Sequence, residues 1–302
     1  MSFTLEWVIQ HESGISIKEF LKVQRISKAA LTDIKFKGGK ILVNGREENV
    51  RYHLKNGDRL FLLFPPELPS SGLIPETLPL SIIYEDEYVL IVQKKYGMNT
   101  IPSREHPFGS LANALVGYYQ DNGIEATTHI VTRLDRDTSG LVLIAKHRHI
   151  HHLLSEQQKG GDVKRKYIAI AEGKVTPLSD TINEPIGRCS DSIIKREVRG
   201  DGQSAITHYR VLTQNNDISI VELSLETGRT HQIRVHLAYR GHPLLGDDLY
   251  GGQIDRINRQ ALHCFFLKFT HPVTKQIMTF TVDLPDDMKR IEQEIKKSEE
   301  TS

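Results

Sequence analysis

The sequence predicts an α+β fold, with a larger domain built on a mixed or antiparallel sheet and a small α/β-type domain before it. Apolar runs of strand length outnumber runs with helical spacing. Short polar turns join most neighbouring strand runs, as in hairpins, rather than the helical crossovers of an alternating βαβ fold. A proline-rich stretch also divides the 302 residues, and a chain of this length commonly forms two domains.

Composition narrows the class of protein. The chain is 38% hydrophobic and 25% charged, and no apolar run approaches the ~20 residues of a membrane span. The N-terminus lacks the basic start and apolar core of a secretory signal. Two cysteines, Cys189 and Cys264, are too few for a disulfide framework and are not spaced for zinc. We therefore expect a cytoplasmic protein with no membrane contact.

Positive charge is concentrated near the N-terminus. Residues 15–66 contain eleven Lys and Arg against five Asp and Glu, whereas the chain from Glu67 onward contains 28 against 31. A small basic module attached to a nearly neutral domain is typical of an RNA-binding appendage. The alternative is a module that is merely basic.

Two short helices and a few strands are expected in this basic module. The capping box Ser16-x-x-Glu19 starts a helix that ends near residue 24. Ser27 can cap a second helix, which Gly38-Gly39 closes. Strands are expected at 41–43 and 59–64, and each adjoins an Asn-Gly turn, the strongest short signal for a hairpin.

Proline marks the boundary between the two domains. Five prolines follow one another closely and are mixed with serine and glycine: Pro65, Pro66, Pro69, Pro75 and Pro79. Proline at this density continues neither a helix nor a strand ladder. We expect a first domain at 1–66, a linker at 67–80 and a second domain at 81–302.

The second domain combines hairpin strands with a few helices. Strands are expected at 81–84, 88–92, 141–145, 165–171, 206–212, 218–225, 262–269 and 277–282. Helices are expected at 108–120 with Ser110 as cap, at 148–158, at 230–239 and from 286 onward. In the third of these helices, Thr230, Arg234 and Leu237 would share one side.

Three polar segments interrupt the apolar pattern of the second domain. The first, RLDR at 133–136, precedes a Thr-Ser-Gly turn and a buried strand, a placement that holds polar side chains rigidly at the surface. The second has Tyr167 at the start of a strand, and the third runs from 227 to 236, where a strand ends and a helix begins. On the residues alone, a solvated salt-bridge patch explains the first segment and half-buried packing explains Tyr167.

Four motifs lie in a fixed order: RLDRDTSG at 133–140, KYIA at 166–169, TGRTHQIRVHLA at 227–238 and GDDLYG at 246–251. Together they resemble the RluA/RluD-type ribosomal large-subunit pseudouridine synthases, and the resemblance extends from about Leu80 to Leu284. The turns VNGR at 43–46 and NGDR at 56–59 resemble the S4 RNA-binding domain, a common partner in that family.

The resemblance implies an RNA-modifying isomerase that needs no cofactor and no metal. The family breaks the C1′–N1 bond of a uridine, turns the detached base and rejoins it through C5. Asp135 matches the essential aspartate, a nucleophile or base that works by attack at C6, attack at C1′ or a glycal route. Arg234 matches the active-site basic residue, with a bidentate fork available to Asp135. Tyr167 matches the tyrosine that packs on the flipped base and takes a proton.

RNA contacts are implied on both domains. Arg133 matches the arginine that fills the gap left by a flipped nucleotide. The other expected RNA-binding residues are Arg136, Arg229 and His231 near the site and Lys28, Lys35 and Lys37 on the first domain. Phosphate contact and simple helix packing are both open for His231 and His236. Ribosomal RNA is the expected partner, with transfer RNA as the alternative, and a monomer is expected from family precedent and the lack of a coiled-coil pattern.

Two positions depart from the family pattern. Thr132 stands where relatives usually have histidine, and threonine neither stacks like imidazole nor carries its charge. QKKYG at 93–97 replaces Asn-Lys-Pro-x-Gly, which alters a loop and therefore substrate choice. Thr132 favours an alternative function, a catalytically inactive RNA-binding or ribosome-assembly factor on the same scaffold. A hydrolase built on Asp135 and a histidine lacks a nucleophile motif such as Gly-x-Ser-x-Gly.

Two further clusters are expected to have no role in chemistry. His147, His149, His151 and His152 are spaced so that they scatter around a helix, which favours a solvated face over a metal site. Asp247 and Asp248 resemble a carboxylate pair, but in the family this segment supports the site structurally.

Overall fold

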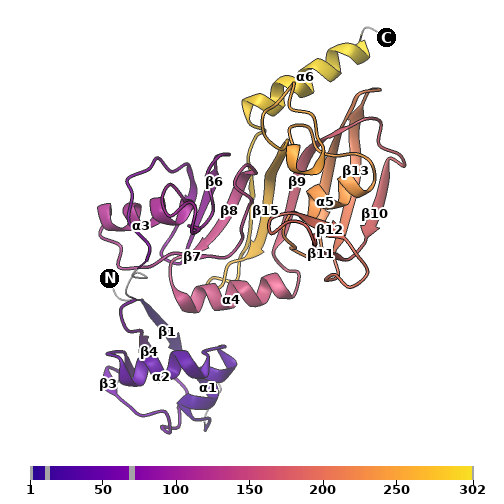
Figure 1. Cartoon of the computed structure of the whole chain (residues 1–302). Coiled ribbons are helices and arrows are strands. Elements are labelled where there is room, and N and C mark those ends of the chain that lie inside the picture. Colours follow the sequence, from indigo (N-terminus) through magenta and orange to yellow (C-terminus); the bar gives the residue numbers. More distant parts are fainter. Residues whose placement is uncertain (1–2, 11–13, 68–71, 301–302) are drawn as a thin grey trace.

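The computed structural model describes residues 3–10, 14–67 and 72–300. These form a four-stranded and a ten-stranded sheet, together with a separate two-stranded hairpin (Figure 1). The two larger sheets have separate hydrophobic cores. The four-stranded sheet has the antiparallel order β1 (Thr4–Val8), β4 (Arg59–Leu63), β2 (Lys40–Val43) and β3 (Arg46–Glu47). We refer to this sheet and its helices, residues 3–64, as the N-terminal unit.

Helices α1 (Ile17–Val23) and α2 (Lys28–Phe36) supply the other half of the core of the N-terminal unit, which includes Ile17, Ile34 and Leu60. The predicted capping box is confirmed: the backbone N–H of Glu19 donates to Ser16 Oγ at 3.3 Å, and that of Ser16 donates to Glu19 Oε2 at 2.8 Å. The sequence pattern does not predict β1, because no turn signal flanks it and its hydrogen bonds come from pairing with β4.

The ten-stranded sheet has the strand order β10-β13-β14-β9-β15-β8-β6-β5, with β16 beside β15 and β7 beside β8. Its strands are β5 (Ile82–Glu85), β6 (Val89–Lys94), β7 (His129–Ile130), β8 (Ser139–Ala145), β9 (Lys164–Glu172), β10 (Ser179–Asn183), β13 (Ile206–Gln214), β14 (Ile218–Leu225), β15 (Leu262–Thr270) and β16 (Ile277–Thr281). Strands β8 and β15 are parallel, and the other pairs in the described part of this sheet are antiparallel. The predicted mixed sheet is confirmed.

Helices cover both faces of this sheet. They are α3 (Leu111–Asp121), α4 (Arg148–Lys159), α5 (Gln232–Tyr239) and α6 (Asp286–Glu300) (Figure 1). Strand β9 is buried on both faces: Tyr167 and Ala169 join the main core with α5, whereas Ile168 and Ile170 join a second core with α6. Since side chains alternate along a strand, this burial points Tyr167 toward the α5 side.

The strands that the sequence pattern misses are all short. Besides β1, these are β3, β7, β10 and the hairpin of β11 (Ile186–Arg188) and β12 (Arg196–Val198). Strands of two or three residues, such as β3, β7, β11 and β12, carry too few alternating positions to produce a periodic signal, so their partners define them. Among the described helices, none has the length and apolarity to cross a membrane.

The N-terminal unit docks on α4 through aromatic and histidine rings. The Phe3 ring stacks on His147 with centroids 3.9 Å apart, and the Phe64 ring stacks on His149 at 5.6 Å. His147 is 6% exposed and His149 is 4% exposed, so the predicted solvated histidine face is wrong at these two positions. The sequence does not reveal that a second structural unit covers this side of the helix.

Ion pairs surround the stacked rings. Glu67 Oε2 lies 2.6 Å from His129 Nε2, and Glu67 Oε1 accepts from the Arg148 backbone N–H at 3.0 Å. The Arg148 guanidinium reaches across to Asp33 on α2 at 2.6 Å. Burial lowers the pKa of His147 to about 4 and that of His149 to about 3, so both rings are neutral at pH 7.

We predict that acid weakens this contact. Below the ordinary histidine pKa of ~6.5, His147 of the unfolded chain binds a proton, whereas the buried ring of the folded protein does not. The free energy of unfolding therefore falls as the pH falls from ~6.5 toward 4, and His147 accounts for a decrease on the order of 3 kcal/mol. Urea denaturation between pH 4 and 7 should show a shallower pH dependence for His147→Gln than for wild type. His208→Gln, at a side chain that is 40% exposed, is the matched control and should keep the wild-type slope. Equal slopes in all three proteins would contradict the prediction.

Candidate active site

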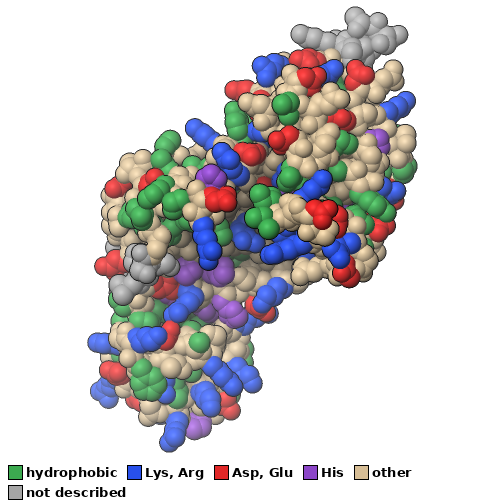
Figure 2. Space-filling view, viewed as in Figure 1, with side chains coloured by type: hydrophobic (Ala, Val, Ile, Leu, Met, Phe, Trp, Pro, Cys, Tyr) green, Lys and Arg blue, Asp and Glu red, His purple; other side chains and the backbone are tan. Residues whose placement is uncertain are grey.

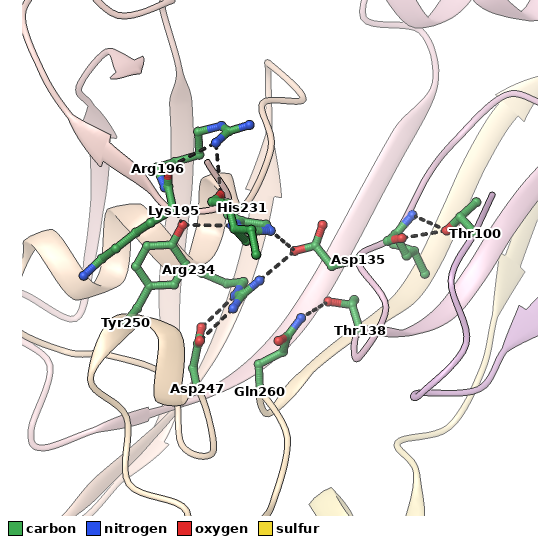
Figure 3. A network of polar contacts seen from close by, with 12 residues as sticks. Thr100, Asp135, Thr138, Lys195, Arg196, His231, Arg234, Asp247, Tyr250 and Gln260 are labelled. Carbon is green, nitrogen blue, oxygen red and sulfur yellow. Dashed lines mark hydrogen bonds and ion pairs between the residues drawn. The ribbon is translucent and has the colours of Figure 1, made fainter. Parts of the chain in front are cut away.

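Asp135, Tyr167 and Arg234 line one cavity although they lie on different elements. Asp135 is in the loop between β7 and β8, Tyr167 is in β9 and Arg234 is in α5. Arg234 Nη1 donates to Asp135 Oδ2 at 3.3 Å across 99 positions of sequence (Figure 3). A wider cavity of about 580 Å³ opens beside them and is also lined by Asp135.

The bidentate partner of Arg234 is Asp247, not Asp135 as expected. Arg234 Nε and Nη2 donate to the two carboxylate oxygens of Asp247, both at 2.7 Å, and the third nitrogen reaches Asp135 (Figure 3). Burial opposes the charge of Arg234, but the hydrogen bonds and negative charge of Asp247 outweigh it and raise the pKa of the guanidinium. Asp247 therefore fixes the orientation of the cation that faces Asp135.

Solvent access separates the two carboxylates. The side chain of Asp247 is 0% exposed, whereas that of Asp135 is 30% exposed and lies at the cavity wall. Within the described residues, the polar contacts of the Asp135 carboxylate are all made to Oδ2, from Arg234 and from His231 Nε2 at 3.9 Å. The second oxygen, Oδ1, is left for a ligand.

Contacts with the backbone hold the Asp135 loop. Thr100 Oγ1 donates to the Leu134 carbonyl at 2.6 Å and accepts from the Leu134 N–H at 3.2 Å, and Gln260 Nε2 donates to Thr138 Oγ1 at 2.9 Å (Figure 3). Local sequence reasoning does not find Thr100 or Gln260, since both act from distant parts of the chain. Their contacts restrain the residues on both sides of Asp135.

The side chain of Lys94 also holds the Asp135 loop. Its Nζ donates to the carbonyls of Met98, Arg136 and Lys95 at 2.7, 2.9 and 3.0 Å, and the residue is 1% exposed. Burial lowers its pKa to about 7. The sequence carries a signal for this residue, a lysine two positions after the apolar strand run VLIV at 89–92, but that run does not indicate what the amine contacts.

Glycine is required where the loop enters the sheet. Gly140 has a φ of +120°, and a Cβ at this position would lie 2.2 Å from the carbonyl oxygen of Cys264 on β15. The close approach of the two backbones leaves space for glycine alone, which also tolerates this φ. The Thr-Ser-Gly turn of the sequence motif is therefore a packing requirement between β8 and β15.

Tyr167 presents a protonated hydroxyl near the site. The residue is 4% exposed and pairs with Leu223 of β14 and Cys264 of β15. Burial raises the pKa of its hydroxyl, so Tyr167 is neutral at pH 7. The Arg165 guanidinium lies over its ring, 5.9 Å from the centroid. The ring is thus a rigid apolar wall of the cavity, more fully buried than the half-buried packing expected from its sequence position.

Helix α5 begins at Gln232, two residues later than predicted, so Thr230 does not share a helix face with Arg234. Gln232 organises the turn instead: its Oε1 accepts from Thr227 Oγ1 at 2.8 Å and from the Arg229 N–H at 2.9 Å. The side chain of Gln232, in the first turn of the helix, holds the residues before it in a non-helical turn. The sequence pattern that predicts a helix therefore starts earlier than the helix itself.

The two histidines of this segment have different environments. His236 is fully buried, with Nδ1 at 2.8 Å from Thr207 Oγ1 and Nε2 at 2.9 Å from the Glu184 carbonyl, so it packs the helix and is not available to phosphate. His231 is the N-cap residue, with a φ of 58°, and lines the cavity. A non-glycine residue in this left-handed region carries roughly 1–3 kcal/mol of strain, which is characteristic of functional sites.

A basic rim surrounds the wider cavity. Arg133, Arg136 and Arg229 are exposed there, and Arg165 lies beside them. Figure 2 shows Lys and Arg side chains gathered beside the hollow in the middle of the molecule. The expected RNA-binding arginines therefore lie together around the candidate site.

The three lysines predicted to bind RNA lie apart from this rim, on the N-terminal unit. Lys28, Lys35 and Lys37 are exposed on α2 and its C-cap. Lys37 pairs with Asp33 at 2.9 Å, and Lys35 Nζ lies 5.0 Å from the Phe36 ring centroid. Thr132, in contrast, is fully buried, and its hydroxyl accepts from the Leu143 N–H at 3.0 Å, so it faces the core.

Comparison with known proteins relates this chain to RNA pseudouridine synthases. Residues 88–239 match the family described as RNA pseudouridylate synthase. YjbO of Bacillus subtilis, an uncharacterized RNA pseudouridine synthase, is 52% identical over 92% of this chain and 98% of its own length. Ribosomal large subunit pseudouridine synthase D of Xanthomonas campestris is 34% identical over 84% of this chain and 81% of its own length. The solved structure of human RNA pseudouridylate synthase domain containing 4 shares the fold, with a TM-score of 0.59 at 22% identity over 72% of this chain and 93% of that chain.

We predict that Asp247→Asn destabilises the protein. The substitution keeps the size of the side chain but removes the charge that compensates buried Arg234, and breaking such a pair typically lowers the free energy of unfolding by about 3–5 kcal/mol. Urea denaturation at pH 7 measures the change. The neighbouring Asp248→Asn, at an exposed position, is the control and should be nearly neutral. Equal stability of the two variants would show that Asp247 does not hold the guanidinium.

Proposed function

Because this chain belongs to the RNA pseudouridylate synthase family, and is therefore an isomerase that converts uridine in RNA to pseudouridine, we propose that Asp135 is its catalytic residue and ribosomal RNA its substrate. One observation supports the role of Asp135 above others. Its partly exposed carboxylate lines the cavity and contacts a guanidinium that a second, fully buried carboxylate holds in place.

The reaction sets the demands on this carboxylate. The C1′–N1 bond breaks, the C1′–C5 bond forms, C5 loses a proton and N1 gains one. Asp135 attacks C6, attacks C1′ or acts as the base on a route through a glycal, and each route requires an ionised carboxylate that reaches the nucleotide. Arg234 supplies positive charge at Oδ2, which leaves Oδ1 as the reacting oxygen.

Tyr167 packs against the base of the flipped uridine in this proposal. Its buried ring and the Asp135 carboxylate line the same cavity, and its hydroxyl is protonated at pH 7 because burial raises its pKa. A protonated phenol starts as a hydrogen-bond donor. If it takes the C5 proton, as the family resemblance implies, it must pass on its own proton in the same step.

The arginines of the rim bind the RNA backbone around the flipped nucleotide. Arg133 lines the cavity of the site together with Asp135 and is exposed, a position from which it can fill the gap in the base stack. Arg136, Arg229 and His231 complete the RNA-binding set. Positive charge at this density neutralises phosphates, which supplies much of the affinity for RNA.

We also propose how the chain is divided. Residues 1–66 form an S4-like RNA-binding domain with Lys28, Lys35 and Lys37 on its RNA-facing side, 67–80 form the linker and 81–302 form the catalytic domain. The separate core of the N-terminal unit and the exposure of these lysines support this division. The protein works as a monomer in the cytoplasm, and the ribosomal names of several relatives support ribosomal over transfer RNA.

Asp135→Asn is expected to abolish catalysis while retaining RNA binding. The amide preserves the shape of the side chain but is neither a nucleophile nor a base, so tritium release from RNA containing 5-tritiated uridine should fall by at least ~10³-fold. Asp137→Asn, two positions away with a 40% exposed side chain, is the matched control and should remain active. Full activity of Asp135→Asn would refute the assignment.

The substrate proposal is tested in cells. Mapping of pseudouridines across all RNAs, with and without this gene, should reveal a site in ribosomal RNA that disappears on deletion and returns with the wild-type gene but not with Asp135→Asn. A site that behaves this way in transfer RNA alone would overturn the ribosomal substrate without affecting the role of Asp135.

A further inference from the structure

A hydroxyl links the backbone of strand β12 to the imidazole that faces Asp135. The Arg196 backbone N–H donates to Tyr250 Oη at 2.9 Å, and Tyr250 Oη lies 2.8 Å from His231 Nδ1 (Figure 3). The other ring nitrogen, His231 Nε2, lies 3.9 Å from Asp135 Oδ2. Three segments that are distant in sequence thus converge on the carboxylate through one tyrosine.

The direction of the first hydrogen bond sets the direction of the second. An amide N–H only donates, so Tyr250 Oη is the acceptor toward Arg196. When the single hydroxyl hydrogen points to His231 Nδ1, that nitrogen accepts and Nε2 carries the proton of the neutral ring. In the other tautomer, Tyr250 Oη would accept hydrogen bonds from both the Arg196 N–H and the His231 Nδ1–H. The hydroxyl hydrogen of Tyr250 would then need a further acceptor, but the groups near its ring include two cations, Arg234 and Lys195, at 5.0 and 5.8 Å from the ring centroid.

Asp135 selects the same tautomer. A carboxylate attracts an N–H group and is repelled by the lone pair of an unprotonated ring nitrogen. Burial lowers the pKa of His231; the Asp135 carboxylate opposes this shift, but burial and the charge of Arg234 outweigh it. The ring is therefore neutral at pH 7 and has one proton to place. Tyr250 and Asp135 both direct that proton to Nε2.

The backbone holds His231 in this orientation. The residue is the N-cap of α5, yet its side chain makes no capping hydrogen bond, although serine, threonine or aspartate would cap the helix at this position. Its φ of 58° lies in the left-handed region, and in this conformation Nδ1 of the ring lies 2.8 Å from Tyr250 Oη. Helix α5 thus lacks a side-chain cap at His231, the residue whose imidazole faces the Asp135 carboxylate.

We propose that Tyr250 is a positioning residue that holds His231 with its proton on Nε2, so that His231 donates to Asp135 when uridine is bound and shares with Arg234 the stabilisation of the carboxylate charge. This inference rests on the proposed role of Asp135. A separation of 3.9 Å is too long for a hydrogen bond, but catalytic contacts commonly shorten in the substrate complex. His231 then acts on Asp135 in addition to its place among the residues proposed to bind RNA.

The first experiment reads the tautomer directly and needs no RNA. Long-range hydrogen–nitrogen correlation spectra are recorded on protein with nitrogen-labelled histidine, and His231→Gln identifies the His231 signals by their loss. Wild type is expected to show a protonated Nε2 and an unprotonated Nδ1, and Tyr250→Phe a mixture of both tautomers. A proton on Nδ1 in wild type overturns the proposal, whatever activity the enzyme has.

The second experiment separates positioning from simple packing. Tyr250→Phe keeps the ring and removes the hydroxyl with both of its hydrogen bonds, to His231 and from the Arg196 N–H. Single-turnover tritium release should fall about fivefold, while RNA affinity changes by less than about twofold. The rate of tritium release by His231→Ala should be about tenfold lower than that of wild type. His231→Gln should retain more activity than His231→Ala, because the amide nitrogen of glutamine takes the place of Nε2 and always carries hydrogen.

The combined variant decides between the two roles. Glutamine has no tautomer to select, so adding Tyr250→Phe to His231→Gln should lower the rate by less than about twofold. An equal fivefold loss in both backgrounds would make Tyr250 a structural residue and refute the proposal. If Asp135→Asn were fully active, the proposed catalytic role would fail, but the measured tautomer would stand as a separate result.

Discussion

One guanidinium shared by two carboxylates connects the parts of the site. Arg234 on α5 is held in a bidentate pair by buried Asp247 and extends its remaining nitrogen to Asp135. A buried guanidinium requires such compensation, since its desolvation is unfavourable without a matching charge. The two acids therefore differ in what they contact: Asp247, fully buried, fixes the cation, and Asp135, at the cavity wall, remains accessible to a ligand.

The rest of the fold restrains the loop that carries Asp135. Thr100 Oγ1 and Lys94 Nζ donate hydrogen bonds to its carbonyls, and Gly140 allows the loop to enter β8 directly against Cys264 of β15. Contacts to backbone atoms restrict the path of a loop whatever side chains it exposes. The loop can therefore present several arginines to solvent while its aspartate stays in place, as a site that develops charge in the transition state requires.

The N-terminal unit packs against the rest of the protein in addition to being covalently linked to it. Rings of Phe3 and Phe64 stack on His147 and His149 of α4, and Glu67 and Arg148 add polar contacts around them. Neutral histidines suit this position because they combine a flat, stackable ring with polar edges. A fixed attachment keeps the basic surface of the N-terminal unit in a defined relation to the arginine rim of the cavity, as the proposed binding of one structured RNA at both places requires.

The sequence by itself determined the local features: the capping box at Ser16, the strands of the mixed sheet other than β7 and β10, the hairpin turns and the motifs that contain Asp135, Tyr167 and Arg234. These follow from contacts between residues a few positions apart, which periodicity and capping chemistry report directly. Tertiary structure alone decided which carboxylate holds Arg234, where Lys94 donates, that Thr132 faces the core and that two histidines of α4 are covered. Each of these involves at least one partner beyond the adjacent residues, such as Arg136 for Lys94 and Asp247 for Arg234. A residue's own neighbours in sequence do not identify that partner, because the fold brings it into place.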